Sequence, residues 1–337
     1  MTLYAGIDLH STNSVLAVVD QDGKRLHRKR YPNDLDRILK ALEPYRGDLD
    51  RIVVESTFNW YWLVDGLQDA GHRPQLAHPP GITPYSGLKH GDDHSDAEHL
   101  ANLARLGLVH EGFIYPREDR KLRDLLRQRL RFVQQSVQLL HSIQSLWNRM
   151  HGTVLSANAF RQLEAKDIES AFPDPSVRMG VLARIKAWQT LQAQAEVLER
   201  WVLELLPDRA GLTLLKSAPG IGKVLGITIL METGPIERFA EVGDHASYCR
   251  MVDSARLSNG KAKGQGNRKS GNRYLCWAYI EAAHHALRLG PVRAWYQRKA
   301  NKSHPVKARK AVAHKIARGC YHVLKARKPF DLKRAFG

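Results

Sequence analysis

The sequence predicts an N-terminal α/β domain, a pair of long helices and a basic, mostly α-helical C-terminal domain. Three observations lead to this fold class. Short apolar runs alternate with helical patterns over the first hundred residues. Apolar residues then recur in steps of three and four for more than three heptads. Basic residues dominate the last third, around two further helical patterns. We expect domain boundaries at 1–115, 116–207 and 208–337.

Composition limits the class of partner. The formal net charge of +18 favours a polyanion, and nucleic acid fits better than a membrane because no amphipathic anchor is evident. No apolar run approaches the length of a membrane span, and the N-terminus enters a strand without a signal pattern, so we expect a cytoplasmic protein. The three cysteines lack metal-ligand spacing and imply no disulfide framework.

The first predicted element is a hairpin whose first strand carries an acid. Residues 4–10 and 14–20 are β-rich runs, and Asp22-Gly23 is a turn signal because Gly tolerates positive φ. Asp8 lies in the middle of the first run. Taken alone, Asp8 could simply cap a turn.

Further acids follow the next elements. Glu55 ends the strand 51–56, at the sheet edge where α/β proteins place ligands, although a glutamate there is usually just exposed. Asp93 and Asp96 share one face of a helix start, where acids also complement the helix dipole. Four converging acids would repel one another unless cations lie between them. Such oxygen ligands select Mg²⁺ or Mn²⁺, and two ions can clamp the attacking and leaving oxygens of a phosphodiester.

Two rival interpretations of this region are weaker. Gly6-Ile7-Asp8 also opens sugar kinases and actin-like ATPases, but these need glycine-rich phosphate loops, and the turn at 11–13 has no glycine. His10, His90, His94 and His99 are too irregularly spaced to favour a zinc site. Residues 1–105 resemble instead a RuvC-type, ribonuclease H-like nuclease core.

The middle of the chain predicts an antiparallel coiled-coil arm. Two long periodic helices, 117–150 and 181–205, flank a segment at 152–175 that reads as irregular. The first half of the first helix is rich in arginine. This is either a solvated face or a phosphate-contacting one.

The C-terminal third combines a phosphate-binding pattern with a basic loop. Residues 214–226 resemble a helix-hairpin-helix, whose turn would offer backbone N–H groups to a phosphate near Gly220, Gly222 and Lys223. Residues 248–273 predict a loop or short hairpin. Its nucleic-acid contacts would be Arg256, Lys261, Lys263, Arg268, Lys269 and Arg273. Ser258 has no His or Asp near it in sequence to form a hydrolase triad, so a serine attacking DNA here would need metal activation.

Together these motifs resemble the DEDD transposases of the insertion-sequence-110 family, near its eleven-eleven subgroup. The resemblance extends over nearly the whole chain. It rests on Gly6-Ile7-Asp8, Val54-Glu55-Ser56, Lys89 with residues 93–97, Pro219-Gly220-Ile221-Gly222, and Ser258-Asn259-Gly260-Lys261 leading to residues 271–275.

The resemblance implies a RuvC-like domain, a coiled-coil arm and a C-terminal transposase domain. It implies Mg²⁺ on Asp8, Glu55, Asp93 and Asp96. The chain departs from the family pattern at residues 89–92, where an extra residue precedes the acid pair, and this leaves Asp92 as the second choice to Asp93. It also implies a serine that becomes linked to DNA, which we assign to Ser258 with Ser254 as the alternative. Family members are similar in using a bridge RNA with donor and target DNA and in assembling as tetramers.

We therefore expect a DNA recombinase that cuts and rejoins strands through a phosphoserine, as a dimer or tetramer. One alternative is a hydrolytic, junction-resolvase-like nuclease in which Ser258 only positions phosphate. The other is a non-catalytic nucleic-acid-binding protein with structural acids. Because Ser258 and the acids lie in different domains, an active site shared between subunits is a further hypothesis.

Overall fold

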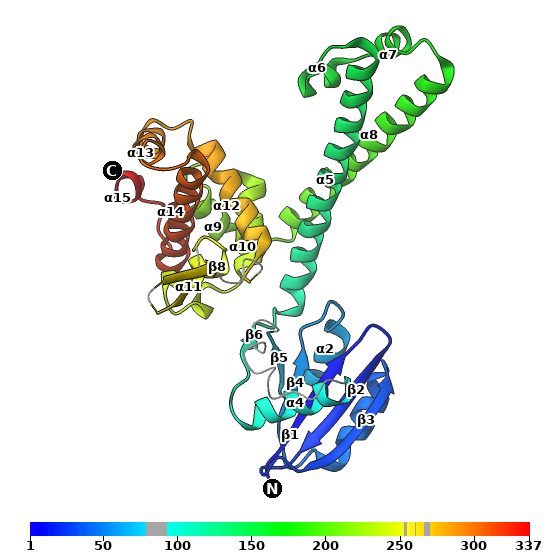
Figure 1. The fold of residues 1–337 in the computed structure, drawn as a ribbon, viewed down its shortest axis with the longest axis vertical. Helices are drawn as coiled ribbons and strands as arrows, with labels where there is room; N and C mark the ends of the chain where they lie inside the picture. The colour runs from blue at the N-terminus through cyan, green and yellow to red at the C-terminus, as the bar shows by residue number, and fades with distance from the viewer. Residues whose placement is uncertain (79–92, 253–254, 260, 266–269) are drawn as a thin grey trace. The chain divides into compact units, whose positions relative to one another are not determined.

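The computed structural model describes residues 1–78, 93–252, 255–259, 261–265 and 270–337 of the 337-residue chain. The chain divides into two compact units, Met1–Tyr115 (unit 1) and Pro116–Gly337 (unit 2), which are described separately (Figure 1). The expected division of the second unit into an arm, 116–207, and a C-terminal domain, 208–337, stays a prediction.

Unit 1 is built on a mixed six-stranded sheet. Its strands are β1 (Leu3–Leu9), β2 (Asn13–Val19), β3 (Arg25–Pro32), β4 (Leu49–Glu55), β5 (Pro74–Ala77) and β6 (Glu111–Gly112), in the order β3-β2-β1-β4-β5-β6. Strands β1, β2 and β3 pair antiparallel, whereas β4 pairs parallel with both β1 and β5. The predicted hairpin and α/β class are therefore confirmed.

Helices cover both faces of the unit 1 sheet. On one face, α1 (Leu35–Leu42) and α2 (Tyr61–Asp69) share a core with the odd-numbered residues of β1. On the other face, α4 (Asp93–Arg105) packs Leu100 and Ala104 against Val53. Because successive side chains of a strand point to opposite faces, β1 is apolar on both sides except at Asp8.

A glycine sets the distance between α4 and the sheet. A Cβ on Gly6 would overlap the carbonyl oxygen of Ala97 and would lie 2.6 Å from the backbone nitrogen of Ala101. The backbones of β1 and α4 therefore approach more closely than any side chain at position 6 would allow. This close approach fixes how the first turns of α4 stand relative to β1.

Unit 2 begins with two long helices that run alongside each other, α5 (Arg117–His151) and α8 (Pro175–Glu204) (Figure 1). Leu122 and Leu126 of α5 share a core with Val202, and Ile143 shares one with Phe160 further along. The expected irregular segment is wrong in detail, since it contains α6 (Ala157–Gln162) and α7 (Ala165–Ala171). Their apolar residues cover the ends of α5 and α8. The coiled-coil assignment stays a prediction.

The remainder of unit 2 is helical around one large core. Its elements are α9 (Arg209–Leu215), α10 (Lys223–Thr233), η3 (Ile236–Arg238), α11 (Val242–Tyr248), the hairpin β7 (Ala255–Ser258) and β8 (Lys261–Gln265), α12 (Arg273–Ala286), α13 (Gly290–Ala300), α14 (Pro305–Ala326) and α15 (Leu332–Phe336). The core joins α10, α12 and α14. Within the described parts of the chain, no helix is long and apolar enough to cross a membrane.

Candidate active site

Asp8 and Glu55 occupy neighbouring positions on adjacent parallel strands. Ile7 of β1 pairs with Val54 of β4, so the two acids come next along their strands at the same level of the sheet. Asp8 alternates with residues that face α1 and α2, as Glu55 does with Val54, so both acids belong to the face covered by α4. Asp8 is buried, and Glu55, the last residue of β4, is half-buried.

The start of α4 lies at the same end of the sheet as Asp8. Gly6 contacts the helix at Ala97 and Ala101, whereas the turn glycine Gly23, at the opposite end of β1, lies beside Arg105 near the end of the helix. The first turn of α4, with Asp93 and Asp96, therefore stands toward the Asp8 end. Asp96 is half-buried. The side chain of Asp93 and the whole of Asp92 lie outside the described residues.

Side-chain amides tie the two acid-bearing strand ends together. His10 Nε2 lies 3.2 Å from Asp8 Oδ2. The carbonyl oxygen of His10 accepts hydrogen bonds from Asn33 Nδ2 and Asn59 Nδ2, each at 3.0 Å. Because Asn59 lies in the loop after Glu55, this carbonyl links the ends of β1 and β4. Neither asparagine could be predicted from the sequence, since only the fold brings positions 10, 33 and 59 together.

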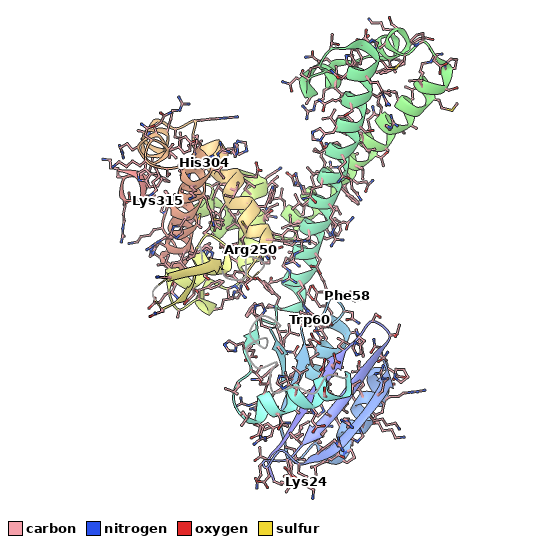
Figure 2. The ribbon with its side chains drawn as sticks, in the orientation of Figure 1. Lys24, Phe58, Trp60, Arg250, His304 and Lys315 are labelled. Atoms are coloured by element: carbon pink, nitrogen blue, oxygen red, sulfur yellow. The ribbon has the colours of Figure 1, made fainter. Side chains whose placement is uncertain are left out.

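An exposed aromatic side chain follows Glu55 in the same loop. The Phe58 side chain is 84% exposed, whereas Trp60, two residues later, packs into the core (Figure 2). Phe58 carries no signal in the sequence, because an aromatic residue after a strand is usually buried. Its exposure beside the acid-bearing edge leaves a flat apolar surface open to solvent.

The donor set at this edge suits a hard divalent cation in type. Carboxylate oxygens are the ligands that Mg²⁺ and Mn²⁺ take, and a buried carboxylate such as Asp8 needs a compensating charge. Among the described side chains no three metal-binding groups form a cluster. The expected set includes Asp93, whose side chain is outside that description. The four-carboxylate metal site stays a prediction.

In unit 2 the expected nucleophile lies in a two-stranded hairpin. Ser258 ends β7 and pairs with Lys261, which begins β8, and Asn259 between them has a φ of 51°. The hairpin agrees with one of the two predicted forms of this segment. For Arg256, Ser258 and Lys263 only the backbone position is described. The Lys261 side chain is exposed. Ser254, Arg268 and Lys269 lie outside the described residues.

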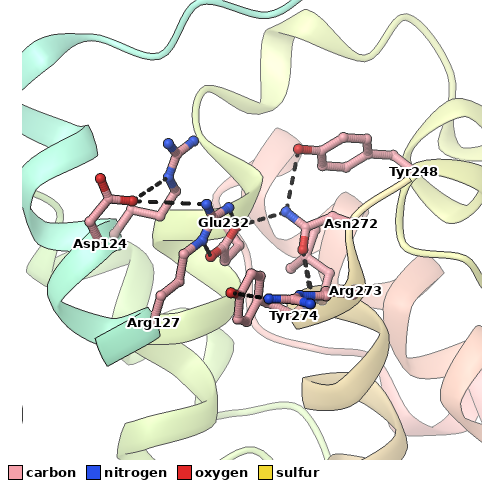
Figure 3. Close-up of polar contacts among 9 residues, drawn as sticks. Asp124, Arg127, Glu232, Tyr248, Asn272, Arg273 and Tyr274 are labelled. Atoms are coloured by element: carbon pink, nitrogen blue, oxygen red, sulfur yellow. Dashed lines mark hydrogen bonds and ion pairs between the residues drawn. The ribbon is translucent and has the colours of Figure 1, made fainter. Parts of the chain in front are cut away.

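A buried polar network holds the far end of the segment that carries this hairpin (Figure 3). Arg127 of α5 donates two hydrogen bonds to Glu232 of α10, at 2.6 and 2.8 Å. Asn272 Nδ2 donates to the same carboxylate at 2.7 Å and lies 3.3 Å from the hydroxyl of Tyr248. The Asn272 Oδ1 atom accepts from the backbone N–H groups of Tyr274 and Leu275, so Asn272 caps α12.

Charge pairing makes this network robust. Burial, the largest single cause, would lower the pKa of Arg127, but its hydrogen bonds to Glu232 and the charges of Glu232, Tyr274 and Asp124 together outweigh burial and raise the pKa above its ordinary value. Glu232 is 1% exposed. Arg127 supplies the positive charge that offsets the cost of burying its carboxylate, and Asn272 donates a further hydrogen bond to it. Glu232 was not predicted from the sequence. Its signal was a single acid within the mostly apolar helix 223–233.

The same contacts revise the interpretation of the arginine-rich half of α5. Arg127 pairs with Glu232, Arg129 lies 3.1 Å from Glu199 of α8, and both Arg120 and Arg123 are buried. The solvated-face alternative is therefore wrong for these residues. Arg127 and Arg129 form ion pairs inside unit 2, and Arg120 and Arg123 are packed away from solvent.

The turn before α10 has a structural role that the sequence left open. Gly220 has a φ of 76°, and a Cβ there would overlap the carbonyl oxygen of Ala282 on α12. Gly222 and Lys223 are exposed, with Lys223 Nζ 3.0 Å from Glu199. Arg273 is exposed and donates to the hydroxyl of Tyr274 at 2.9 Å. The helix-hairpin-helix and its phosphate contacts stay predictions.

Comparison with known proteins finds two family matches. A DEDD model of the IS110 type, described as a transposase, matches residues 5–151. A model described as "Transposase IS116/IS110/IS902 family" matches residues 212–297. Among solved structures, Thermus thermophilus RuvC in complex with a Holliday junction substrate is 17% identical, covers 33% of this chain and 100% of its own, and has a TM-score of 0.27. A comparison with curated proteins finds no match.

Proposed function

The chain belongs to the IS110 family of DEDD transposases, and from that premise we propose that it cuts and rejoins DNA through a phosphoserine on Ser258. As a transposase it is a DNA-processing enzyme. We further propose its nucleophile, its metal ligands, an RNA partner and its assembly state.

The observation that carries the proposal is the placement of Asp8 and Glu55. They stand level on adjacent parallel strands, on the face covered by α4, and the acids of the α4 start lie toward the same end. The mixed sheet supports a RuvC-like, ribonuclease H-like assignment for unit 1. Asp8, Glu55, Asp93 and Asp96 would hold two Mg²⁺ ions. When bound, such ions stabilise charge on the attacking and leaving oxygens.

The serine supplies the covalent step. Its Oγ forms a bond to the phosphorus while the bond from phosphorus to a deoxyribose oxygen breaks. The hydroxyl loses its proton, and the leaving oxygen gains one. The phosphoserine keeps the energy of the phosphodiester, so the reverse attack by a DNA hydroxyl can rejoin strands. Ser254 is the alternative nucleophile.

The partners follow from charge and from the family. The net charge of +18 supports binding of donor and target DNA, and Arg256, Lys261, Lys263, Arg268, Lys269 and Arg273 would neutralise phosphates around the serine. A bridge RNA and assembly into a dimer or tetramer are carried over from the resemblance. We propose them together with an active site that unites Ser258 of one subunit with the acids of another.

One experiment separates this function from its alternatives. Protein, cognate RNA and end-labelled DNA are incubated with Mg²⁺ and analysed on a denaturing gel for a protein–DNA adduct. An adduct that Ser258→Ala abolishes supports the recombinase. Nicked DNA without an adduct would instead indicate a hydrolytic nuclease, and binding without cleavage would indicate a non-catalytic nucleic-acid-binding protein.

A further inference from the structure

A basic pocket lies between α14 and the C-terminal segment 328–335, apart from every residue assigned above. Its volume is about 640 Å³, well above that of a single phosphate group and within the range of small-ligand sites. Lys315, which Figure 2 labels, lies on its α14 side and is already engaged, since its Nζ donates to the carbonyl oxygen of Ala335 at 2.7 Å.

The charge of this pocket comes from two separate elements. His314, Arg318 and His322 lie one helical turn apart on the same face of α14. Arg334 reaches the pocket from α15. Burial, followed by the charges of Arg334 and Arg318, lowers the pKa of His322. The guanidinium groups of Arg318 on α14 and Arg334 on α15 therefore both lie near the His322 ring.

These cations have no acidic partner that would neutralise them. Within the described residues, Arg318, Lys328 and Arg334 form no ion pair, and Arg318 and Arg334 are exposed. Asp331 is the one acid in the lining, and its carboxylate accepts from the backbone N–H of Arg334 as the cap of α15. The pocket keeps a net positive charge and is open to an anion.

The rest of the lining is apolar and contains an aromatic ring. Phe330 lies against Gly319 of α14, where a Cβ would overlap its ring, and the ring is only half-buried. Val323, Ala326 and Pro329 complete this side. An inorganic anion would leave such a wall unused, whereas a nucleotide has a flat base for the wall and a phosphate for the arginines.

We infer that this pocket binds one unpaired nucleotide of a nucleic acid strand, with its phosphate at Arg318 and Arg334 and its base against Phe330. The inference takes only the class of partner, nucleic acid, from the proposed function. It needs neither the carboxylates of unit 1 nor Ser258. Single-stranded nucleic acids are bound elsewhere by this combination of aromatic stacking and positive charge.

The test measures binding without cleavage. Full-length protein is titrated into a fluorescein-labelled 15-mer of thymidine in EDTA, over a series of salt concentrations, with fluorescence anisotropy as the readout. Arg318→Ala combined with Arg334→Ala leaves the one bound phosphate without its two cations. The slope of log Kd against log salt should therefore decrease by about 0.7, the value for one single-strand phosphate.

Two further variants make the result specific. Lys333→Ala combined with Lys325→Ala removes two exposed charges from the same helices but outside the pocket lining, and should leave the slope within experimental error. Phe330→Leu should weaken binding of the thymidine oligomer about fivefold or more, but not binding of an abasic oligomer of equal length. The abasic comparison within one variant controls for any effect on folding.

The opposite results would overturn the inference. Equal slopes for the arginine and lysine double variants would show that the pocket contacts no phosphate. An equal loss for thymidine and abasic oligomers in Phe330→Leu would show that no base binds there. Because the assay contains EDTA, failure of the proposed cleavage chemistry cannot produce either result. Failure of the pocket likewise leaves the adduct assay intact.

Discussion

Arg127 and Glu232 form a two-point ion pair across 105 positions of sequence, with Arg127 Nε 2.6 Å from Glu232 Oε1. The pair joins α5 to α10. Glu232 also accepts a hydrogen bond from Asn272 at the start of α12, so the same carboxylate links all three helices. Asn272 closes the segment that carries the Ser258 hairpin. The pair therefore anchors one end of that segment to α5 and α10.

The first prediction concerns this anchor. Glu232→Gln removes the two-point ion pair of the largely buried Arg127 guanidinium and leaves it only Asp124, 3.8 Å away, as an acidic neighbour, so we expect the free energy of unfolding to decrease by about 2 kcal/mol. Urea denaturation followed by circular dichroism measures it. Glu118→Gln is the matched control, because Glu118 forms an exposed pair with Lys121 on the same helix and should change stability little. An equal, small effect of both variants would contradict the anchoring role.

The second prediction concerns pH. Burial, together with the charge of Arg238, lowers the pKa of His245 to about 4, whereas an unfolded histidine titrates near 6.5. As pH falls through this window the unfolded chain binds a proton that the folded chain does not. The free energy of unfolding therefore decreases between about pH 6.5 and 4, by about 3 kcal/mol from this residue.

Substitution isolates that contribution. His245→Phe keeps an aromatic ring among Phe239, Tyr279 and Tyr321 and removes the titrating group. Its unfolding free energy should depend less on pH than that of the unaltered protein, whereas His284→Ala, at an exposed position of α12, should not alter the dependence. An unchanged pH dependence in His245→Phe would show that other groups are responsible.

The third prediction concerns the contact between β1 and α4. Gly6→Ala places a methyl group against the backbone of α4 and must move the helix that carries Asp93 and Asp96. We expect a loss of about 1–3 kcal/mol in stability together with a loss of DNA cleavage. Gly47→Ala, where a Cβ meets open space, is the control and should retain both. Wild-type cleavage by Gly6→Ala would show that helix position does not matter.

The fourth prediction tests the metal ligands. Asp8→Asn and Glu55→Gln each keep the shape of the side chain but remove a charge that a cation requires, so DNA cleavage should be abolished. Binding of DNA, measured by gel shift without Mg²⁺, should persist because the phosphate contacts lie elsewhere. Asp50→Asn, at an exposed position of β4, should leave cleavage unchanged. Retained cleavage in either ligand variant would refute the metal assignment.

Local patterns were sufficient to predict the first unit's class. Alternating apolar runs and the Asp22-Gly23 turn identified the hairpin and the α/β class, and the positions of Asp8 and Glu55 on their strands followed from the same runs. Asn33 and Asn59 could not be predicted, because their shared acceptor, the carbonyl of His10, is brought to them only by the sheet.

In unit 2, the periodicity of apolar residues predicted the long helices but not which acids pair with the arginines on them. The arginines of α5 looked like a solvated face because charge is normally exposed, and their counter-charges, Glu199 and Glu232, are 70 and 105 positions away. Pairings at that range depend on tertiary packing. The short helices α6 and α7 were likewise missed, since isolated turns of helix have little periodic signal.

Whether Ser258 forms the covalent link to DNA can be determined by mass spectrometry of the adduct. Adduct formed with Mg²⁺ is digested with nuclease and protease, and the modified peptide is sequenced by fragmentation. We expect a nucleotide phosphate on Ser258. It should be absent in Ser258→Ala and still present in Ser254→Ala. A phosphate on Ser254 or any other residue, or cleaved DNA with no modified peptide, would contradict it.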